Sequence, residues 1–394
     1  MANGQYIGVN GVARKVTTPY IGVEGVARKV TVGYVGVDGV ARLFFAPEGG
    51  SVVLEVEKIT SDTYANETTY TAEEFILLSI HPKTGGTVNV TYGGLTKTIT
   101  DTSGAARPVQ TVFFGTFNGI SDTVATPESG MLTIEGECDA FGSGFYSVTS
   151  KSNKYCSCIR NIVDFGNITR IPGNAFNGCT KITELILPDN VNEIVSGAFN
   201  NSSLTRLSIP ASVKNIGDNG AKTAVLNDLT FVDCHALTEI IVDPGNTNYM
   251  AENGVLFNKD KTTLISHPSA SGSVTIPHGV KQIGISAYQG VTGMNNVSLP
   301  DGLLYIGTSA FYKCSGLKSI TIPSSVLEIY SGAFSECSGL TSFSVLAETP
   351  PKMPTGNILS TGATFSITVP KGCGAAYKAA EGWSNYADRI VEAT

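Results

Sequence analysis

The stretch that decides the fold is residues 310–323, which read AFYKCSGLKSITIP. An alanine and an aromatic residue open the stretch, and alternating apolar and polar residues close it at a proline. The same pattern returns every 23 residues, so that Tyr288, Phe311 and Phe334 form a column. A fixed period of this length indicates a solenoid, in which each coil buries its apolar positions against the next coil.

Other columns share this period. The Ala-Phe pair occurs earlier at 175–176 and 198–199. An Ile-Pro or Leu-Pro column contains Leu187-Pro188, Ile209-Pro210, Ile276-Pro277, Leu299-Pro300 and Ile322-Pro323. A third column contains Ile171, Ile194, Ile216, Ile283, Ile306 and Ile329. Several independent columns with one period predict a solenoid from about residue 151 to residue 394.

These repeats closely resemble the BspA-like class of leucine-rich repeat over about residues 165–394. Residues 253–265 resemble that family's irregular repeat, and residues 349–383 resemble its terminal cap. The chain departs from the family pattern at Ser202, where the cysteine of the repeat is lost, and at 217–230, where an insertion is expected to bulge from one edge. The resemblance implies a leucine-rich-repeat solenoid with a C-terminal cap.

Residues 46–150 predict a different architecture. Six apolar or alternating runs, typical of strands, occur at 52–56, 75–80, 87–92, 95–99, 112–115 and 131–135. Gly93-Gly94 separates two of these runs and favours a two-residue hairpin turn. Short strands with turn residues between them indicate a small antiparallel β-sandwich of immunoglobulin-like layout, which we interpret as a spacer.

Residues 1–45 repeat one short phrase three times at a 14-residue period. It reads YIGVNGVARKV at 6–16, and variants follow at 20–30 and 34–44. Asn-Gly and Asp-Gly favour type I′ turns, so each copy predicts a β-hairpin. Small hairpins are marginal alone in water, and we therefore interpret the segment as an attachment or oligomerisation module. Its candidate attachment residues are Tyr6, Arg14, Lys15, Tyr20, Arg28, Lys29, Tyr34 and Arg42.

The repeated sequence of these hairpins, together with the sandwich, resembles segments of structural proteins of tailed phages and prophages. That resemblance implies a fibre or decoration subunit of a virion. Met1-Ala2-Asn3-Gly4 leads straight into the first repeat, so we expect no secretory signal peptide. No apolar run is long enough to span a membrane, and a net charge of −7 argues against a general nucleic-acid binder.

The sequence has few candidate catalytic or metal-ligating residues. We expect no enzymatic activity, no cofactor and no metal site. Cys179, Cys234, Cys314 and Cys337 occupy one repeat column and are expected to be small, buried, reduced side chains, although 314 and 337 come within possible disulfide range. Cys156-Ser157-Cys158 lacks the second ligand pair of a zinc site. The four histidines, expected in turns or at the surface, are His81, His235, His267 and His278. The acidic residues considered as a glycosidase pair, and expected to be merely solvated, are Glu184, Glu239 and Asp301.

The strand face of the solenoid is the remaining candidate site. Alternation in residues 317–322 turns Ile320 and Ile322 inward, and Ser319 and Thr321 outward. The face so defined is polar and poor in aromatics, which suits broad, weak contact with glycans or proteins but equally suits an idle solvent face. The candidate ligand residues are Glu184, Arg206, Ser208, Glu239, Asn296, Ser298, Ser319, Thr321, Ser342 and Ser344.

The leading hypothesis is a non-enzymatic phage structural protein, a tail- or head-attached fibre or decoration subunit. In it the hairpins bind other virion proteins and the solenoid binds a host-surface glycan or protein. Such a protein is made in the bacterial host cytoplasm and displayed on the virion. We expect it to assemble as a homo-oligomer, with a trimer favoured. The alternatives are a bacterial cell-surface adhesin of BspA type and a virion scaffold component whose solenoid binds a neighbouring virion protein. The ligand, the oligomer number and the choice between head and tail stay open.

Overall fold

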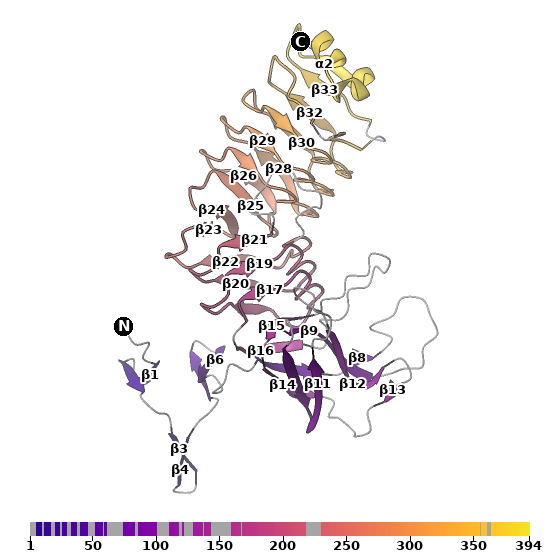
Figure 1. Ribbon diagram of the computed structural model, residues 1–394. Coiled ribbons are helices and arrows are strands. Elements are labelled where there is room, and N and C mark those ends of the chain that lie inside the picture. The colour runs from indigo at the N-terminus through magenta and orange to yellow at the C-terminus, as the bar shows by residue number, and fades with distance from the viewer. Residues whose placement is uncertain are drawn as a thin grey trace.

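The computed structural model shows a mainly β protein that ends in a solenoid (Figure 1). It describes residues 86–100, 159–166, 168–217, 230–354, 356–360 and 364–394, together with the strands before residue 143 whose bounds follow. Within that part of the chain, the helices are too short and too polar to cross a bilayer.

The three repeated phrases at the N-terminus form three antiparallel hairpins. Their strands are β1 (Gln5–Val9) with β2 (Val12–Val16), β3 (Tyr20–Val23) with β4 (Val26–Lys29), and β5 (Gly33–Val37) with β6 (Val40–Phe45). The innermost Cα pair of the first hairpin is Val9 with Val12, and the other two hairpins repeat this two-residue turn. The hairpin prediction is confirmed, and each hairpin is a separate two-stranded sheet.

Two antiparallel sheets follow, as the alternation of residues 46–150 predicts. The first has, in spatial order, β11 (Leu95–Thr100), β10 (Thr87–Tyr92), β14 (Ser129–Gly136), β7 (Val52–Glu57) and β16 (Ile159–Phe165). The second has β13 (Ile120–Ser121), β12 (Gln110–Phe117), β9 (Glu74–Pro82) and β15 (Cys138–Gly142), with the short β8 (Ile59–Thr60) also paired to β9. Because β16 pairs with β7, the first sheet extends past residue 150, where sequence alone placed the end of the spacer.

The turn between β10 and β11 is the one that its sequence predicts. Tyr92 pairs with Leu95, and Gly93 and Gly94 have φ values of 58° and 81°. Both lie in the left-handed region, which glycine enters without steric cost. On one face of this hairpin, Thr87 bonds to Thr100 and Thr91 bonds to Thr96 through their hydroxyls.

The solenoid begins with three coils, which we call the N-terminal segment (168–217 and 230–242). Each coil contributes one strand to each of two parallel sheets. One sheet contains β17 (Arg170–Ile171), β19 (Glu193–Ile194) and β21 (Asn215–Ile216). The other contains β18 (Glu184–Ile186), β20 (Arg206–Ile209) and β22 (Glu239–Val242). The predicted insertion, apart from its two ends, lies outside the described residues.

The later coils, which we call the C-terminal segment (267–394), follow a β-meander that we call the partition. The partition contains β23 (Tyr249–Glu252), β24 (Val255–Asn258) and β25 (Thr263–Ser266), and it continues into the parallel strands β27 (Gln282–Ile283), β29 (Tyr305–Ile306) and β31 (Glu328–Ile329). The second sheet of this segment contains β26 (Gly272–Thr275), β28 (Met294–Ser298), β30 (Ser319–Ile322), β32 (Ser342–Val345), β33 (Ile367–Val369) and β34 (Ile390–Glu392).

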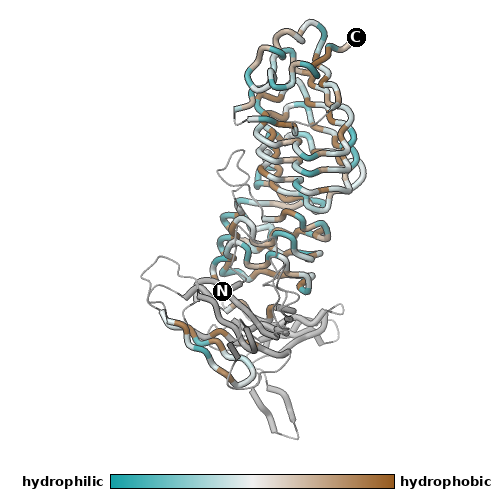
Figure 2. The backbone as a smooth tube through the Cα atoms, turned by 90° about the vertical axis from the view of Figure 1, so that its right-hand side faces the viewer, coloured by the Kyte–Doolittle hydropathy of each residue, from teal (hydrophilic) through white to brown (hydrophobic). Residues whose placement is uncertain are grey.

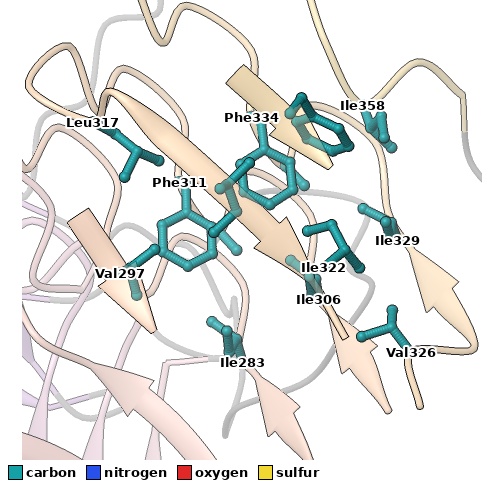
Figure 3. Packing of buried hydrophobic residues seen from close by; sticks show 14 of the residues in the cluster. Ile283, Val297, Ile306, Phe311, Leu317, Ile322, Val326, Ile329, Phe334 and Ile358 are labelled. Carbon is teal, nitrogen blue, oxygen red and sulfur yellow. The ribbon is translucent and has the colours of Figure 1, made fainter. Parts of the chain in front are cut away.

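The repeat columns form the core, as the 23-residue period predicts. Every isoleucine of the third column is at most 1% exposed. The aromatic column is a stack, because the ring of Phe311 lies 5.0 Å from Tyr288 and 5.1 Å from Phe334, nearly parallel to both. Figure 3 shows the rings of Phe311 and Phe334 side by side. Stacked aromatic rings add to the burial energy of their large apolar area. In Figure 2, apolar and polar stretches alternate along each coil, as expected for side chains that point alternately into and out of the solenoid.

The partition divides this core into two clusters. Leu256 and Ile265 pack with the residues of the N-terminal segment. Their neighbours Phe257 and Leu264 pack with those of the C-terminal segment. Successive side chains of a strand point to opposite faces, so one layer of strands separates two hydrophobic cores.

Tyr249 of the partition, and Asn246 just before it, also bond to the last coils of the N-terminal segment. Tyr249 accepts a hydrogen bond on its hydroxyl from the amide of Ile216 at 3.0 Å. Asn246 is fully buried, and its Nδ2 donates to the carbonyls of Pro210 and Val213 at 2.9 and 3.0 Å. These bonds satisfy backbone groups near the point where the insertion interrupts the regular coils.

The C-terminal end of the solenoid is covered by α2 (Gly374–Ala379) and the 3₁₀ helix η2 (Trp383–Arg389), as the resemblance implies. The hydroxyl of Tyr377 donates to the carbonyl of Ala347, and Trp383 Nε1 donates to that of Pro351, both at 2.7 Å. Both rings are fully buried and meet edge to face, which covers the apolar columns of the last coils.

Candidate functional site

The candidate site is the outward face of the sheets that carry one strand from each coil. In the C-terminal segment, Ser319 lies beside Ser342, and Thr321 beside Ser344, in parallel register. Between them, Ile320 is 2% exposed and Ile322 fully buried. The register therefore places the polar residues on the outer face, as predicted, with neighbouring strands roughly 4.8 Å apart.

The ten candidate residues divide between the two segments. Glu184, Arg206, Ser208 and Glu239 lie on β18, β20 and β22 of the N-terminal segment. The others lie on three strands of the C-terminal segment and are Asn296, Ser298, Ser319, Thr321, Ser342 and Ser344. All ten are partly or fully exposed, so the structure places every one on the predicted face.

In the N-terminal segment the charged members bond to one another across the coils. Arg206 Nη1 donates to Glu184 Oε1 at 2.6 Å. Arg206 Nε lies 3.3 Å from Glu239 Oε2 on the other side. The three residues form what we call the ionic ladder, and its single cation lies between the two carboxylates. Glu184 and Glu239 are therefore paired through an arginine, and Asp301 lies apart from them in a turn.

In the C-terminal segment the polar groups of the face are free. Over its described residues, no side-chain hydrogen bond involves Thr275, Asn296, Ser298, Ser319, Thr321, Ser342 or Ser344. The threonine hydroxyls of the β10–β11 hairpin, by contrast, bond to each other across the strands. We call these free groups, together with Ser273 and Thr368 on the two flanking strands, the hydroxyl grid. Ser273 Oγ donates to Asn295 Oδ1 at 3.5 Å, and the donors and acceptors of the other members are available to a ligand.

Sequence reasoning missed three members of the grid, although the signal was present. Ser273 pairs with Asn296, and Thr275 with Ser298, so β26 extends both columns by one coil. The Ile276-Pro277 column marks that strand in the sequence, and the two residues occupy the outward positions before it. At the other end, Thr368 of β33 pairs with Ser344.

The cysteine column is structural and chemically inert where its thiols are free. Cys234, Cys314 and Cys337 are free and buried, and each thiol donates to the backbone carbonyl of the aromatic residue one coil earlier. Burial raises the pKa of Cys234 to about 11. The hydrogen bond with Cys337, and then burial, raise the pKa of Cys314. Both thiols therefore stay protonated at neutral pH, a state that is unreactive.

Cys179 corrects the expectation that the whole column is reduced, because it forms a disulfide bond. Cys234, Cys314, Cys337 and Cys373 are free. Position 179 belongs to the first full coil of the solenoid. The period of the repeat carries no signal for this bond.

The histidines are mostly exposed, as expected, but one is not. His235 and His278 are exposed, whereas His267 is partly buried, with its ring 5.6 Å from that of Tyr288. Burial lowers the pKa of His267 to about 4. His81 lies within β9 and not in a turn. Among the described residues, no three histidine, cysteine or acidic side chains gather as metal ligands.

The candidate attachment residues lie on the N-terminal hairpins, and their side chains are outside the described part of the chain. The backbone register places Tyr6 opposite Lys15 and Tyr20 opposite Lys29. The remaining members of the set also lie on hairpin strands and are Arg14, Arg28, Tyr34 and Arg42.

Comparison with known proteins identifies the repeat. The sequence model described as BspA type leucine-rich repeat region matches in six copies, at residues 146–269 and 266–353. No curated protein matches the chain. The match confirms the resemblance of the solenoid, and it includes none of residues 1–145, so the resemblance to tailed-phage proteins is not shown.

Three solved structures are similar to parts of the chain. A leucine-rich repeat protein of Eubacterium ventriosum is 24% identical with a TM-score of 0.38, and the match covers 52% of this chain and 65% of that one. The pneumococcal vaccine antigen PcpA is 19% identical with a TM-score of 0.41, covering 57% and 64%. A leucine-rich cell surface protein of Faecalibacterium prausnitzii is 21% identical with a TM-score of 0.37, covering 58% of each. The chain thus spans less than two thirds of the length of these proteins.

Proposed function

Because the chain belongs to the BspA-type leucine-rich repeat family, we propose that it is a non-enzymatic binding protein whose solenoid contacts a ligand on a cell surface. The observation that carries this proposal is the hydroxyl grid. It presents free hydrogen-bonding groups on consecutive strands of one rigid sheet. A rigid scaffold that holds polar groups in fixed register suits binding, because little entropy is lost when the ligand contacts them.

The charged residues support binding over catalysis. Glu184 and Glu239 are each paired to Arg206, and such pairing leaves neither carboxylate placed as a free acid or base. The free thiols of the cysteine column are buried and hydrogen-bonded. The proposed binding needs neither a cofactor nor a metal.

We place the protein outside the reducing cytosol when it functions, as an adhesin displayed on a bacterial surface. The disulfide bond at Cys179 supports this location, since disulfides persist mainly in oxidising compartments. The family match is compatible with this adhesin role.

The test is binding of the full chain to intact host epithelial cells and to bacterial cells, measured by flow cytometry. Thr321→Lys places a bulky cation in the grid, and we expect it to weaken binding about tenfold, or about 1.4 kcal/mol. Ser324→Lys is the matched control, because Ser324 is exposed in the same coil but outside the grid. Equal binding by both variants, or no binding by the unchanged chain, contradicts the proposal.

A second candidate, a virion appendage, rests on the N-terminal hairpins. Each is a two-stranded sheet on its own, and such sheets are marginally stable without a partner. In this proposal residues 1–45 bind virion proteins or further copies of the chain, and a homotrimer brings nine hairpins together. The solenoid then contacts a host-surface glycan or protein, or a neighbouring virion protein.

Deletion of residues 1–45 separates the two candidates. For a virion appendage, the deletion removes the chain from purified particles and lowers its oligomeric mass in light scattering. For a cell-surface adhesin, the full chain is recovered with the producing cell's surface fraction and not with particles. Unchanged mass and unchanged incorporation after the deletion contradict an attachment role for the hairpins.

A further inference from the structure

We propose that the hydroxyl grid binds an uncharged polysaccharide that lies along the solenoid axis, across the strands. This inference rests on the proposed binding function and names its ligand class and its location. It assigns binding to the C-terminal segment and excludes the ionic ladder from the ligand site.

The first argument is charge. The grid residues are serine, threonine and asparagine, on five consecutive strands from β26 to β33. A grid without charged members forms no ion pair with a sulfated or carboxylated polysaccharide. Burying such a charge against uncharged hydroxyls costs free energy. The grid therefore favours an uncharged ligand. The cation of the ionic ladder does not favour an acidic ligand either, because Arg206 lies between two carboxylates that repel one.

The second argument excludes a protein partner on this face. Protein interfaces have a desolvated centre that is enriched in aromatic residues, methionine and arginine. The grid has none of these. The large apolar side chains that are exposed in the described chain lie outside it and are Ile186, Leu327, Leu346 and Val391, of which Val391 pairs with Thr368 at the end of the grid. A peptide strand would need a free sheet edge for its backbone hydrogen bonds, whereas the grid is the face of a sheet.

The third argument is the repeat distance. Ser273, Asn296, Ser319 and Ser342 form one column in parallel register, with one residue per coil. Coils follow one another at roughly 4.8 Å, which is about the size of one sugar ring. A linear sugar chain that lies along this column meets a new hydrogen-bonding group at each coil. Its hydroxyls both donate and accept, as the serine and threonine hydroxyls do.

The absence of an aromatic residue in the grid sets the expected strength. Each sugar contributes only the small net free energy of exchanging hydrogen bonds with water for hydrogen bonds with the protein. Affinity must then come from several coils acting on one chain, so it rises steeply with chain length. Single sugars and disaccharides are expected to bind too weakly to measure.

The experiment measures binding of the full chain to immobilised yeast mannan, dextran, laminarin and hydroxyethyl cellulose, with dextran sulfate as the charged counterpart of dextran. We expect at least one uncharged polymer to bind, with affinity increasing over a length series, and dextran sulfate not to bind. The double variant Ser319→Ala/Ser342→Ala should lose about tenfold in affinity, whereas Ser324→Ala, outside the grid, should lose none. Thermal melts of both variants report whether the fold is intact.

Failure of all four uncharged polymers, or equal binding by the double variant, overturns the inference. Its failure is distinguishable from failure of the proposed function. If Thr321→Lys abolishes cell binding, and that binding is destroyed by protease but survives periodate, the grid binds a protein and only the polysaccharide assignment is wrong. If the unchanged chain binds no cells, the proposed function itself is wrong.

Discussion

The two solenoid segments share one repeat but differ in regularity and in their outer faces. In the N-terminal segment a residue is missing at Ser202, an insertion follows at 217–230, and charges on neighbouring coils pair with one another. In the C-terminal segment the aromatic column keeps its 23-residue spacing, and the strands that carry the hydroxyl grid contain no charged residue. The difference shows that the same apolar core can carry two different surfaces. Inward and outward positions alternate along each strand, so the outward residues can change while the inward residues stay the same.

The partition separates the two segments physically, because each segment has its own hydrophobic cluster. Stability in solenoids is approximately a sum of coil terms and nearest-neighbour terms. Damage in one segment should therefore stay largely in that segment. The predictions below test this separation and proceed from the largest expected effect to the smallest.

The largest effect is expected from Phe311→Ala in the C-terminal segment. The ring of Phe311 is fully buried between two parallel rings, so its removal should cost about 3–5 kcal/mol. Hydrogen exchange measured by mass spectrometry should lose protection in residues 272–345 while residues 168–216 keep theirs. Phe199→Ala, in the stack of the N-terminal segment, is the matched variant and should show the reverse. Equal loss in both segments would show that the partition does not insulate them.

Asn246→Ala should weaken the junction between the segments. Asn246 bonds through Nδ2 to two carbonyls of the N-terminal segment, and through Oδ1 to the amides of Asn248 and Tyr249. Because these backbone groups then lose a buried partner, we expect a cost of about 3 kcal/mol in chemical denaturation. Asn248→Ala is the control, since Asn248 is exposed, and it should cost under about 1 kcal/mol. Similar costs for the two variants would contradict the role assigned to Asn246.

His267 should make the junction sensitive to acid. Burial lowers its pKa from 6.5 to about 4, so well above pH 6.5 neither the folded nor the unfolded chain is protonated there. Between pH 6.5 and 4 the unfolded chain binds the proton and the folded chain does not, so folding stability falls as the pH falls. His267→Phe should reduce the drop in Tm between pH 7 and pH 4.5, whereas His278→Phe, at an exposed position, should not. An unchanged drop in the first variant would exclude His267 as its cause.

The smallest effect is expected from the ionic ladder. Its side chains are between 28% and 56% exposed, so solvent screens the pairs. Arg206→Met should cost at most about 1 kcal/mol, and the cost should shrink when the melt is repeated in high salt. Ser319→Ala on the hydroxyl grid should leave Tm unchanged at both salt concentrations. A large cost independent of salt would mean that Arg206 acts through packing and not through charge.

The sequence predicted most of the regular structure, since regular structure is where local pattern and burial agree. The aromatic, isoleucine and Ile-Pro columns gave the coils and their inward faces, and Asn-Gly, Asp-Gly and Gly-Gly gave the hairpins. For the candidate site, the alternation of apolar and polar residues was enough to predict which residues point outward. Ser273 and Thr275 were missed only because their coil has no Ala-aromatic pair to mark it.

What the sequence by itself determined is which side chains point inward and which outward, because a fixed period and an alternation of two assign every residue to one side of the sheet. What only the tertiary structure decided is which outward groups bond to one another. Arg206 meets Glu184 and Glu239 across separate coils, whereas Ser319 and Ser342 lie side by side without bonding. The partition likewise depends on contacts between distant parts of the chain. Such contacts are set by how coils stack in space, and a period along the chain does not record them.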